Sequence, residues 1–405
     1  MQDVTEVEYR KVRLERVVLV GVWSSRETTQ AQAEESLREL AALAETAGAV
    51  VCDGLLQHRI KPDAATYVGS GKARELAGIV AQEEADTISC GRRPAAKANA
   101  ASLEDATKVK VVDRTAVILD IFAQHATSRE GKAQVELAQL QYMLPRLRGW
   151  GGSLSRQAGG RAAGDAGIGS RGPGETKIEM DRRVIRSRIA KLRKQIEQMA
   201  PARDVKRGAR RRFGLPTVAV VGYTNAGKSS LTNRLTGSAE LVENALFATL
   251  DTAVRRARAK DGRQYAYVDT VGFVRRLPTQ LIEAFKSTLE EVSEADLIVH
   301  VVDGSHPDPF SQIDAVDDVL SDIDGVETIP TIIVFNKADR MDEATRERIE
   351  ALMPEAYIVS AFSGEGVDEL RMQVESMLPT RTCMSRRCCH TLPVRWCRAY
   401  VNTAK

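Results

Sequence analysis

Residues 222–229 read Gly-Tyr-Thr-Asn-Ala-Gly-Lys-Ser, and this stretch decides the fold of the chain. It matches the phosphate-loop pattern, in which glycines let the backbone wrap a diphosphate so that consecutive N–H groups point at its oxygens. The apolar run 217–221 before the loop predicts a buried parallel strand, and residues 230–235 after it predict a helix whose N-terminus faces the phosphates. This context predicts an α/β domain with a mostly parallel sheet and helices on both faces.

Each position of this loop has an expected task. Lys228 is predicted to reach the β and γ phosphates, and the hydroxyl of Ser229 is predicted to bind Mg²⁺. Asn225 has two interpretations that the residues alone leave open. It is either a residue that tolerates positive φ in a tight loop or an oxygen ligand for a monovalent cation beside the phosphates. The other positions expected to line the nucleotide are Gly222, Tyr223, Thr224, Ala226, Gly227 and Ser230.

A second motif, Asp269-Thr-Val-Gly272, follows the strand-like run 264–268. A carboxylate at a strand end can hold Mg²⁺ through water, and a glycine there lets its amide approach a γ-phosphate. We therefore assign Asp269 to the metal and Gly272 to catalysis, with Thr270 and Val271 beside the nucleotide.

Two further motifs predict which base is bound. Asn336-Lys337-Ala-Asp339 follows the strand-like run 331–335, and Asp339 can accept hydrogen bonds from N1–H and the 2-amino group of guanine, a pair of donors that adenine lacks. Ser360-Ala361, after another short apolar strand, fits the loop whose backbone amide contacts guanine O6. Four motifs in this order predict an enzyme that binds GTP and GDP and hydrolyses GTP.

One departure from Ras-like enzymes bears on the rate. The residue after Gly272, where those enzymes carry a glutamine that orients water, is Phe273, so slow intrinsic hydrolysis is expected. Thr249 is the candidate switch threonine that senses Mg²⁺ and the γ-phosphate. Thr252 is its rival, and either threonine could instead cap a turn. Together with Lys228 and Gly272, Thr249 completes the predicted catalytic set, and its neighbours expected near the nucleotide are Phe247, Ala248 and Leu250.

The net charge of +3 hides a basic segment between residues 146 and 171. Arginines alternate there with many glycines, and Asp165 is its only acid. Basic side chains on a pliable backbone suit RNA phosphates, although a solvated loop without a partner is the alternative. The predicted RNA contacts are Arg148, Arg156, Arg161 and Arg171.

Helical patterns flank this segment and predict two antiparallel helices with a basic tip. Apolar residues recur at spacings of three and four on both sides. They are Ala133, Leu137, Leu140, Leu144 and Leu147 before the segment, and Ile185, Ile189, Leu192, Ile196 and Met199 after it. Arg183, Arg186, Lys191 and Lys194 on the second helix are either solvated or face RNA.

The first hundred or so residues predict a small α/β unit. We expect strands at 16–22, 48–52 and 109–113 and helices at 32–47 and 72–82. The turn at 68–72 is interpreted as a helix cap or RNA contact rather than an ATP site. No apolar run approaches the roughly 20 residues that span a bilayer, and the charged start differs from a signal peptide, so we expect a cytoplasmic monomer without a membrane span.

At four places the sequence resembles the HflX family of ribosome-associated GTPases: 113–122, 141–147, 169–177 and 269–273. The resemblance covers residues 14 to 379. It implies GTP and Mg²⁺ as ligands, binding to the large (50S) ribosomal subunit and its rRNA, partial association with ribosomes, and a role in splitting stalled or idle ribosomes under stress. It also favours K⁺ as a ligand of Asn225, because related potassium-dependent GTPases carry asparagine there. The implied layout is an α/β N-terminal domain at 1–115, a helical hairpin at 116–206 and a GTPase domain at 213–379.

Two segments depart from the family pattern. Residues 380–405 contain four cysteines where an α/β C-terminal domain rich in aliphatic residues is expected. Their spacing lacks the paired CxxC units of a zinc site, and disulfides are not expected in a cytosolic GTPase. Back-translation into a neighbouring frame gives a sequence like the start of that domain, so we interpret the tail as truncated or frame-shifted. Residues 89–100 are a second candidate for an out-of-frame patch. The alternative function is therefore a ribosome-binding nucleotide switch that lacks splitting activity.

Overall fold

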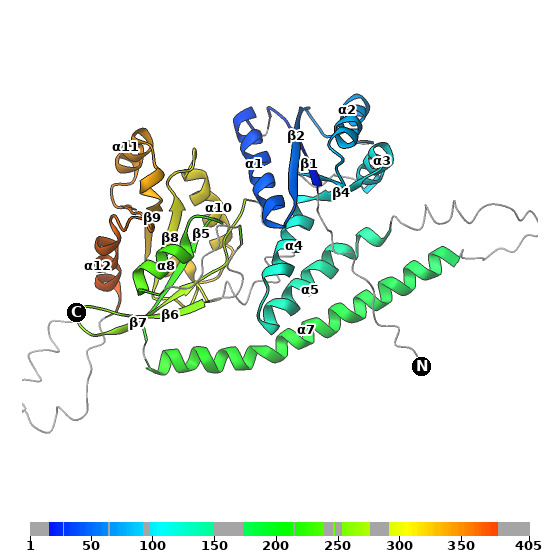
Figure 1. Cartoon of the computed structure of the whole chain (residues 1–405). Helices are drawn as coiled ribbons and strands as arrows, with labels where there is room; N and C mark the ends of the chain where they lie inside the picture. Colours follow the sequence, from blue (N-terminus) through cyan, green and yellow to red (C-terminus); the bar gives the residue numbers. More distant parts are fainter. Residues whose placement is uncertain are drawn as a thin grey trace, which may run out of the picture.

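The computed structural model describes residues 16–26, 28–63, 65–91, 97–148, 173–213, 215–238, 246–247, 253–275 and 291–379. Figure 1 shows an N-terminal α/β unit and a larger α/β unit side by side, with one long helix, α7, running beneath both. The predicted α/β class, with a helical hairpin between two sheet-containing parts, is confirmed.

The N-terminal unit is a parallel sheet of four strands in the order β2-β1-β3-β4. Its elements are β1 (Arg16–Trp23), α1 (Gln30–Thr46), β2 (Val50–His58), α2 (Ser70–Gln82), β3 (Thr87–Cys90), α3 (Lys97–Thr107) and β4 (Lys110–Asp113). Strand β3 was not predicted, and its last two residues, Ser89 and Cys90, belong to the segment interpreted as an out-of-frame patch. Both are fully buried between β1 and β4, so this part of the segment fits the sheet.

Helix α1 begins at a capping box. The Thr29 hydroxyl accepts the Gln32 N–H, and the Gln32 side chain accepts the Thr29 N–H. Leu40 and Leu43 lie on the buried face of the helix. Gly69 is the N-cap residue of α2, and its φ of 98° suits glycine, which agrees with the interpretation of this turn as a helix cap.

A helical region connects the two sheets. It contains α4 (Arg114–His125), α5 (Arg129–Met143), the short η1 (Arg146–Arg148) and α7 (Pro173–Phe213). Helices α5 and α7 lie antiparallel (Figure 1), and their contact is the predicted apolar seam of Leu137, Leu140, Ile189 and Leu192. Both Nε and Nη2 of Arg188 donate to the Glu136 carboxylate across this seam.

The larger unit is a sheet of six strands in the order β10-β9-β8-β5-β7-β6, parallel except for the edge strand β6. Its elements are β5 (Thr217–Gly222), α8 (Lys228–Thr236), β6 (Ala253–Arg258), β7 (Gln264–Asp269), β8 (Leu297–Asp303), α10 (Phe310–Leu320), η2 (Val326–Thr328), β9 (Thr331–Asn336), η3 (Ala338–Arg340), α11 (Glu343–Leu352), β10 (Tyr357–Ile358) and α12 (Val367–Met377).

Strand β5 is the centre of this sheet, and its side chains alternate between two cores. Val218 and Val220 pack beneath α8 and α12, whereas Ala219 and Val221 pack beneath α10. Helices therefore cover both faces, as predicted. Among the described residues, no helix has both the length and the apolar character needed to cross a bilayer.

Candidate nucleotide site

The phosphate loop joins β5 to α8, and two of its glycines are required by close approach. At Gly222, with φ of 150°, an added Cβ would lie 2.0 Å from the carbonyl oxygen of Val301. At Gly227, with φ of 87°, an added Cβ would lie 2.3 Å from Nδ2 of Asn336. Asn225 is exposed and has φ of 59°, the left-handed conformation that its first interpretation requires. This conformation leaves the cation interpretation untested.

Lys228 lies at the N-terminus of α8 and is 6% exposed. Its ammonium donates to the carbonyl oxygen of Tyr223 at 2.8 Å. Burial lowers the pKa of Lys228 to about 8, an effect that the nearby Asp269 carboxylate opposes. Gly272 faces it, because an added Cβ there would lie 3.0 Å from the lysine Nζ. The two residues predicted to contact the γ-phosphate therefore lie together.

The residues predicted to hold Mg²⁺ also converge. The Ser229 hydroxyl donates to Oδ2 of the fully buried Asp269 at 2.6 Å. A hydroxyl and a carboxylate oxygen this close fit the oxygen ligands that Mg²⁺ prefers. Thr249 and its rival Thr252 lie outside the described residues, as do Ala248 and Leu250, so their assignments remain predictions.

The Asp269–Gly272 motif is attached to the phosphate loop by backbone bonds. Thr224 N–H donates to the Phe273 carbonyl oxygen at 2.7 Å, and Phe273 N–H donates to the Gly222 carbonyl oxygen at 3.1 Å. The Phe273 ring is 2% exposed and packs in the core beneath α10. This placement agrees with the expectation that the ring takes no part in proton transfer.

The side chains of Thr270 and Val271 also face protein interior. The Thr270 hydroxyl donates to the Val220 carbonyl oxygen at 2.7 Å, and Val271 packs in an apolar cluster with the N-terminal unit. A contact of either residue with nucleotide would therefore run through its backbone.

The loops predicted to read the base are held to one another through Asn336, which is 2% exposed. Its Nδ2 donates to the Ala226 carbonyl oxygen at 2.9 Å, and its Oδ1 accepts the Ala361 N–H at 3.0 Å. The Ser360 hydroxyl donates to Oδ1 of Asp339. Lys337, with φ of 66°, extends its Nζ to within 2.7 Å of the Asp303 carboxylate at the end of β8. One amide side chain thus joins the phosphate loop to both predicted base loops.

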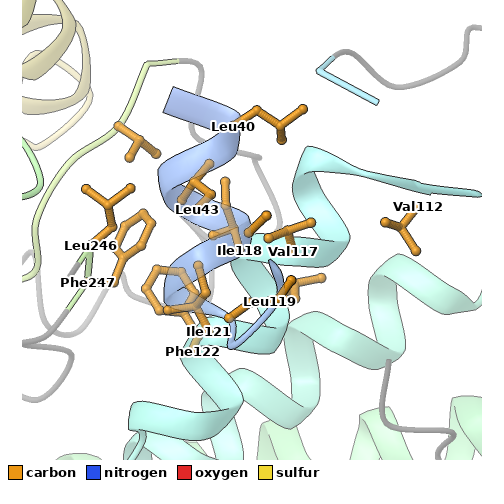
Figure 2. Close-up of a cluster of buried hydrophobic side chains, with 14 of the residues drawn as sticks. Leu40, Leu43, Val112, Val117, Ile118, Leu119, Ile121, Phe122, Leu246 and Phe247 are labelled. Carbon is orange, nitrogen blue, oxygen red and sulfur yellow. The ribbon is translucent and has the colours of Figure 1, made fainter. Parts of the chain in front are cut away.

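The N-terminal unit packs directly against this site, which the sequence did not predict. Phe247, two residues before Thr249, is 2% exposed, and its ring centroid lies 4.6 Å from that of Phe122 on α4. Figure 2 shows Leu246 and Phe247 packed against α1 and α4. The Leu246 N–H also donates to the Thr46 hydroxyl at 3.3 Å. Phe247 is predicted to lie near the nucleotide; its side chain belongs to this contact between the two units, so a contact with nucleotide would run through its backbone.

Comparison with known proteins identifies the family. Three family descriptions match in order along the chain: "GTP-binding GTPase N-terminal" at residues 34–123, "GTP-binding GTPase Middle Region" at 125–210 and "50S ribosome-binding GTPase" at 217–337. GTPase HflX of Caldanaerobacter subterraneus is 49% identical over 364 residues, which are 90% of this chain and 81% of the relative. The chain belongs to the HflX GTPase family. It is therefore a GTP-hydrolysing enzyme, as the motifs predicted.

A second HflX protein is similar over nearly the same share of the chain. GTPase HflX of Escherichia coli is 41% identical over 361 residues, which are 88% of this chain and 81% of the relative. Among solved structures, the complex of SsGBP with GDP matches with a TM-score of 0.50 and 24% identity, over 90% of this chain and 98% of that one. This structural similarity supports the fold of this HflX-family chain.

Proposed function

We propose that this GTPase binds the large ribosomal subunit and its rRNA and dissociates stalled or idle ribosomes under stress, with slow intrinsic hydrolysis that the ribosome stimulates. The observation that carries the proposal is the form of α7, a helix of 41 residues packed on α5 along one apolar face. Several basic residues on the rest of its surface are exposed, among them Arg183, Arg186, Lys191 and Lys194. A long rigid helix with exposed cations suits a groove of RNA phosphates.

The family adds weight to this proposal. The matched G-domain family is described as a 50S ribosome-binding GTPase, and the relatives are HflX proteins. On this proposal Arg148, Arg156, Arg161 and Arg171 contact rRNA at the tip between α5 and α7. Arg148 lies in η1, and the other three lie outside the described residues. The functional units are residues 1–115, 116–206 and 213–379, and the protein acts in the cytoplasm as a monomer that is partly ribosome-associated.

The ligands follow from the same proposal. Ser229, Asp269 and Thr249 hold Mg²⁺, and Asn225 contributes an oxygen to K⁺ beside the phosphates. When bound, these cations supply positive charge against the β and γ phosphates. Lys228 and the Gly272 amide hold the γ-phosphate, Asp339 and the Ala361 amide select guanine, and Asn336 keeps these loops in register.

The test is binding to purified 50S subunits by pelleting over a salt series. Replacing Arg183 and Arg186 by alanine should weaken binding and reduce the slope of log affinity against log salt by about one to two, because each lost phosphate contact releases about one fewer counterion. Replacing Arg256 and Arg258, two exposed arginines on the edge strand β6, is the matched control and should leave both values unchanged. Undiminished affinity of the α7 variant across the salt series would contradict the proposed role of this helix.

A further inference from the structure

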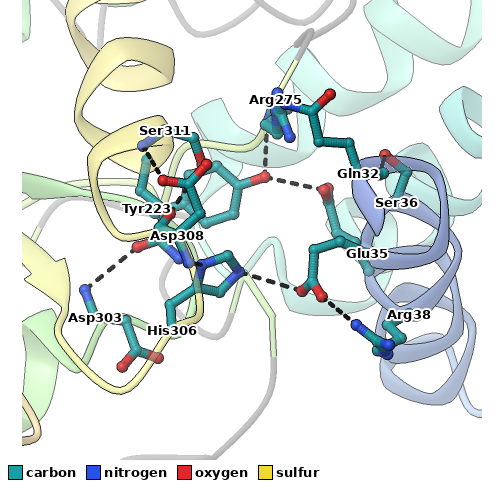
Figure 3. A network of polar contacts seen from close by, with 12 residues as sticks. Gln32, Glu35, Ser36, Arg38, Tyr223, Arg275, Asp303, His306, Asp308 and Ser311 are labelled. Atoms are coloured by element: carbon teal, nitrogen blue, oxygen red, sulfur yellow. Dashed lines mark hydrogen bonds and ion pairs between the residues drawn. The ribbon is translucent and has the colours of Figure 1, made fainter. Parts of the chain in front are cut away.

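Tyr223, the second residue of the phosphate loop, makes hydrogen bonds to two distant parts of the chain. It is 8% exposed. Its hydroxyl donates to Oε2 of Glu39 on α1 at 3.0 Å and accepts the backbone N–H of Arg275 at 2.9 Å. Figure 3 shows the Tyr223 hydroxyl directed towards α1, with the bond to Arg275 drawn. One phenol oxygen therefore joins the N-terminal unit to the segment that follows Gly272.

Glu39 is held in place for this contact. Its Oε1 accepts a hydrogen bond from Nη2 of Arg114 on α4 at 2.5 Å, and the two side chains are 16% and 15% exposed. Burial raises the pKa of Tyr223 above its ordinary value, and the Glu39 carboxylate raises it further, so the hydroxyl keeps the proton that it donates. A hydrogen bond from a phenol to an ionised carboxylate in a partly buried site is among the stronger ones.

The other partner, Arg275, ends the described range 253–275, which contains Gly272. It lies three residues after Gly272, and between them Phe273 pairs with the phosphate loop while Val274 is fully buried. Val274 belongs to the same apolar cluster as Leu40 and Phe122 of the N-terminal unit. The chain just after Gly272 is therefore held to the phosphate loop twice, by the backbone bonds of Phe273 and by the bond from the Arg275 N–H to the Tyr223 hydroxyl.

A second polar contact lies beside the first. Nε2 of His306, in the loop after β8, is 3.2 Å from Oε1 of Glu35, one turn before Glu39 on α1. Both contacts appear in Figure 3 along the same side of α1. Helix α1 thus contacts the larger unit at two places, the phosphate loop and the loop after β8. The second place adjoins Asp303, the partner of Lys337.

We propose that Tyr223 is a positioning residue for GTP hydrolysis. Its hydroxyl couples helix α1 to the Gly272 segment, so that docking of the N-terminal unit holds the Gly272 amide where the γ-phosphate is predicted to lie. The role is distinct from the backbone contacts with phosphate that the loop pattern predicts for this position. It rests on the assignment of Gly272 to the γ-phosphate and is independent of any ribosome contact.

The test compares Tyr223→Phe with the wild type in GTP hydrolysis without ribosomes. The variant should lower kcat between about two- and tenfold, as expected for one net hydrogen bond, and should leave GDP affinity within about twofold, because GDP has no γ-phosphate. Glu39→Ala, which changes the other unit, should lower kcat by a similar factor. The double variant should lose no more than the larger of the two single losses, because both remove the same connection.

The chain offers a matched control. Tyr142 donates to Asp113 at 2.8 Å, and Asp113 is paired with Arg146 at 2.6 Å, so a tyrosine, a carboxylate and an arginine also meet within the N-terminal half. Tyr142→Phe should leave kcat and GDP affinity unchanged. An unchanged kcat in Tyr223→Phe, single losses that multiply in the double variant, or a parallel fall in GDP affinity would each overturn the proposal. Because the assay contains no ribosome, its result is separate from that of the 50S binding test.

Discussion

The connection made by Asn336 yields a prediction whose size follows from the structure. Asn336→Ala removes two hydrogen bonds, a buried one from Nδ2 to the Ala226 carbonyl oxygen and a partly buried one from the Ala361 N–H to Oδ1. Each bond is worth about 0.5–1.5 kcal/mol net, and the Ala226 carbonyl left in a buried site adds to the loss. We expect a total of about 2–3 kcal/mol.

This loss should appear in nucleotide affinity, because GDP binding must then order loops that the asparagine holds in the wild type. At about 1.4 kcal/mol per tenfold, GDP should bind roughly 30- to 150-fold more weakly. The assay is a titration with a fluorescent GDP analogue, accompanied by denaturant unfolding of the same variants. Asn336→Asp keeps the acceptor for the Ala361 N–H but loses the donor to Ala226, so its affinity should fall by a smaller factor. Affinity of Asn336→Ala within threefold of the wild type would refute the reasoning.

Three further predictions concern other residues. Asp339→Asn should shift preference from guanine towards xanthine nucleotides, which carry a carbonyl in place of the 2-amino group, and unchanged GTP affinity in a titration would refute that assignment. Potassium should accelerate hydrolysis over sodium in the wild type but not in Asn225→Ala, whose GDP affinity should stay close to normal; equal wild-type rates in the two salts, with and without large subunits, would leave Asn225 as a turn residue. His300, 1% exposed in β8, has its pKa lowered from 6.5 to about 4 by burial and then by Lys228. Between pH 6.5 and 4 the unfolded chain therefore binds a proton at this histidine that the folded chain does not bind. The contribution of His300 to the free energy of unfolding is full above pH 6.5 and should fall by about 2 kcal/mol by pH 5. Denaturant unfolding at pH 7.5 and 5 should show a smaller loss in His300→Leu, and an equal loss would contradict this.

The sequence was sufficient to predict the fold of the GTPase domain, because the patterns that mark its strands and motifs are local. Apolar runs bounded by glycine or polar motifs placed β5, β7 and β9, and the motifs placed Lys228, Asp269 and Asn336 at or just after the carboxyl ends of these three strands of one sheet. The seam between α5 and α7 followed from its spacing for the same reason.

Strand β3 was missed because Thr87–Cys90 is short, contains polar residues and adjoins a segment of unusual composition. Its burial comes from its neighbours in the sheet, which a local pattern does not reveal. The predicted hairpin ended at residue 206, whereas α7 continues through Pro201 to Phe213. The apolar repeat that predicted this helix ends at Met199, so the pattern carried no signal for the last turns of α7.

The contacts between the two units could not be predicted. Tyr223 and Glu39 are 184 residues apart, and His306 and Glu35 are 271 apart, so no periodic signal connects them. Phe247 likewise resembled a residue of a nucleotide-binding loop, and its packing against Phe122 depends on how the two units dock.

The proposed ribosome function is tested most directly by sedimentation of 70S ribosomes through a sucrose gradient after incubation with the full chain and a nonhydrolysable GTP analogue. The account predicts conversion of 70S particles to 30S and 50S subunits, with the chain in the 50S fraction and little conversion with GDP. Binding to 50S subunits without conversion would indicate a nucleotide switch that lacks splitting activity. Intact 70S particles with the chain left at the top of the gradient would contradict the proposed function.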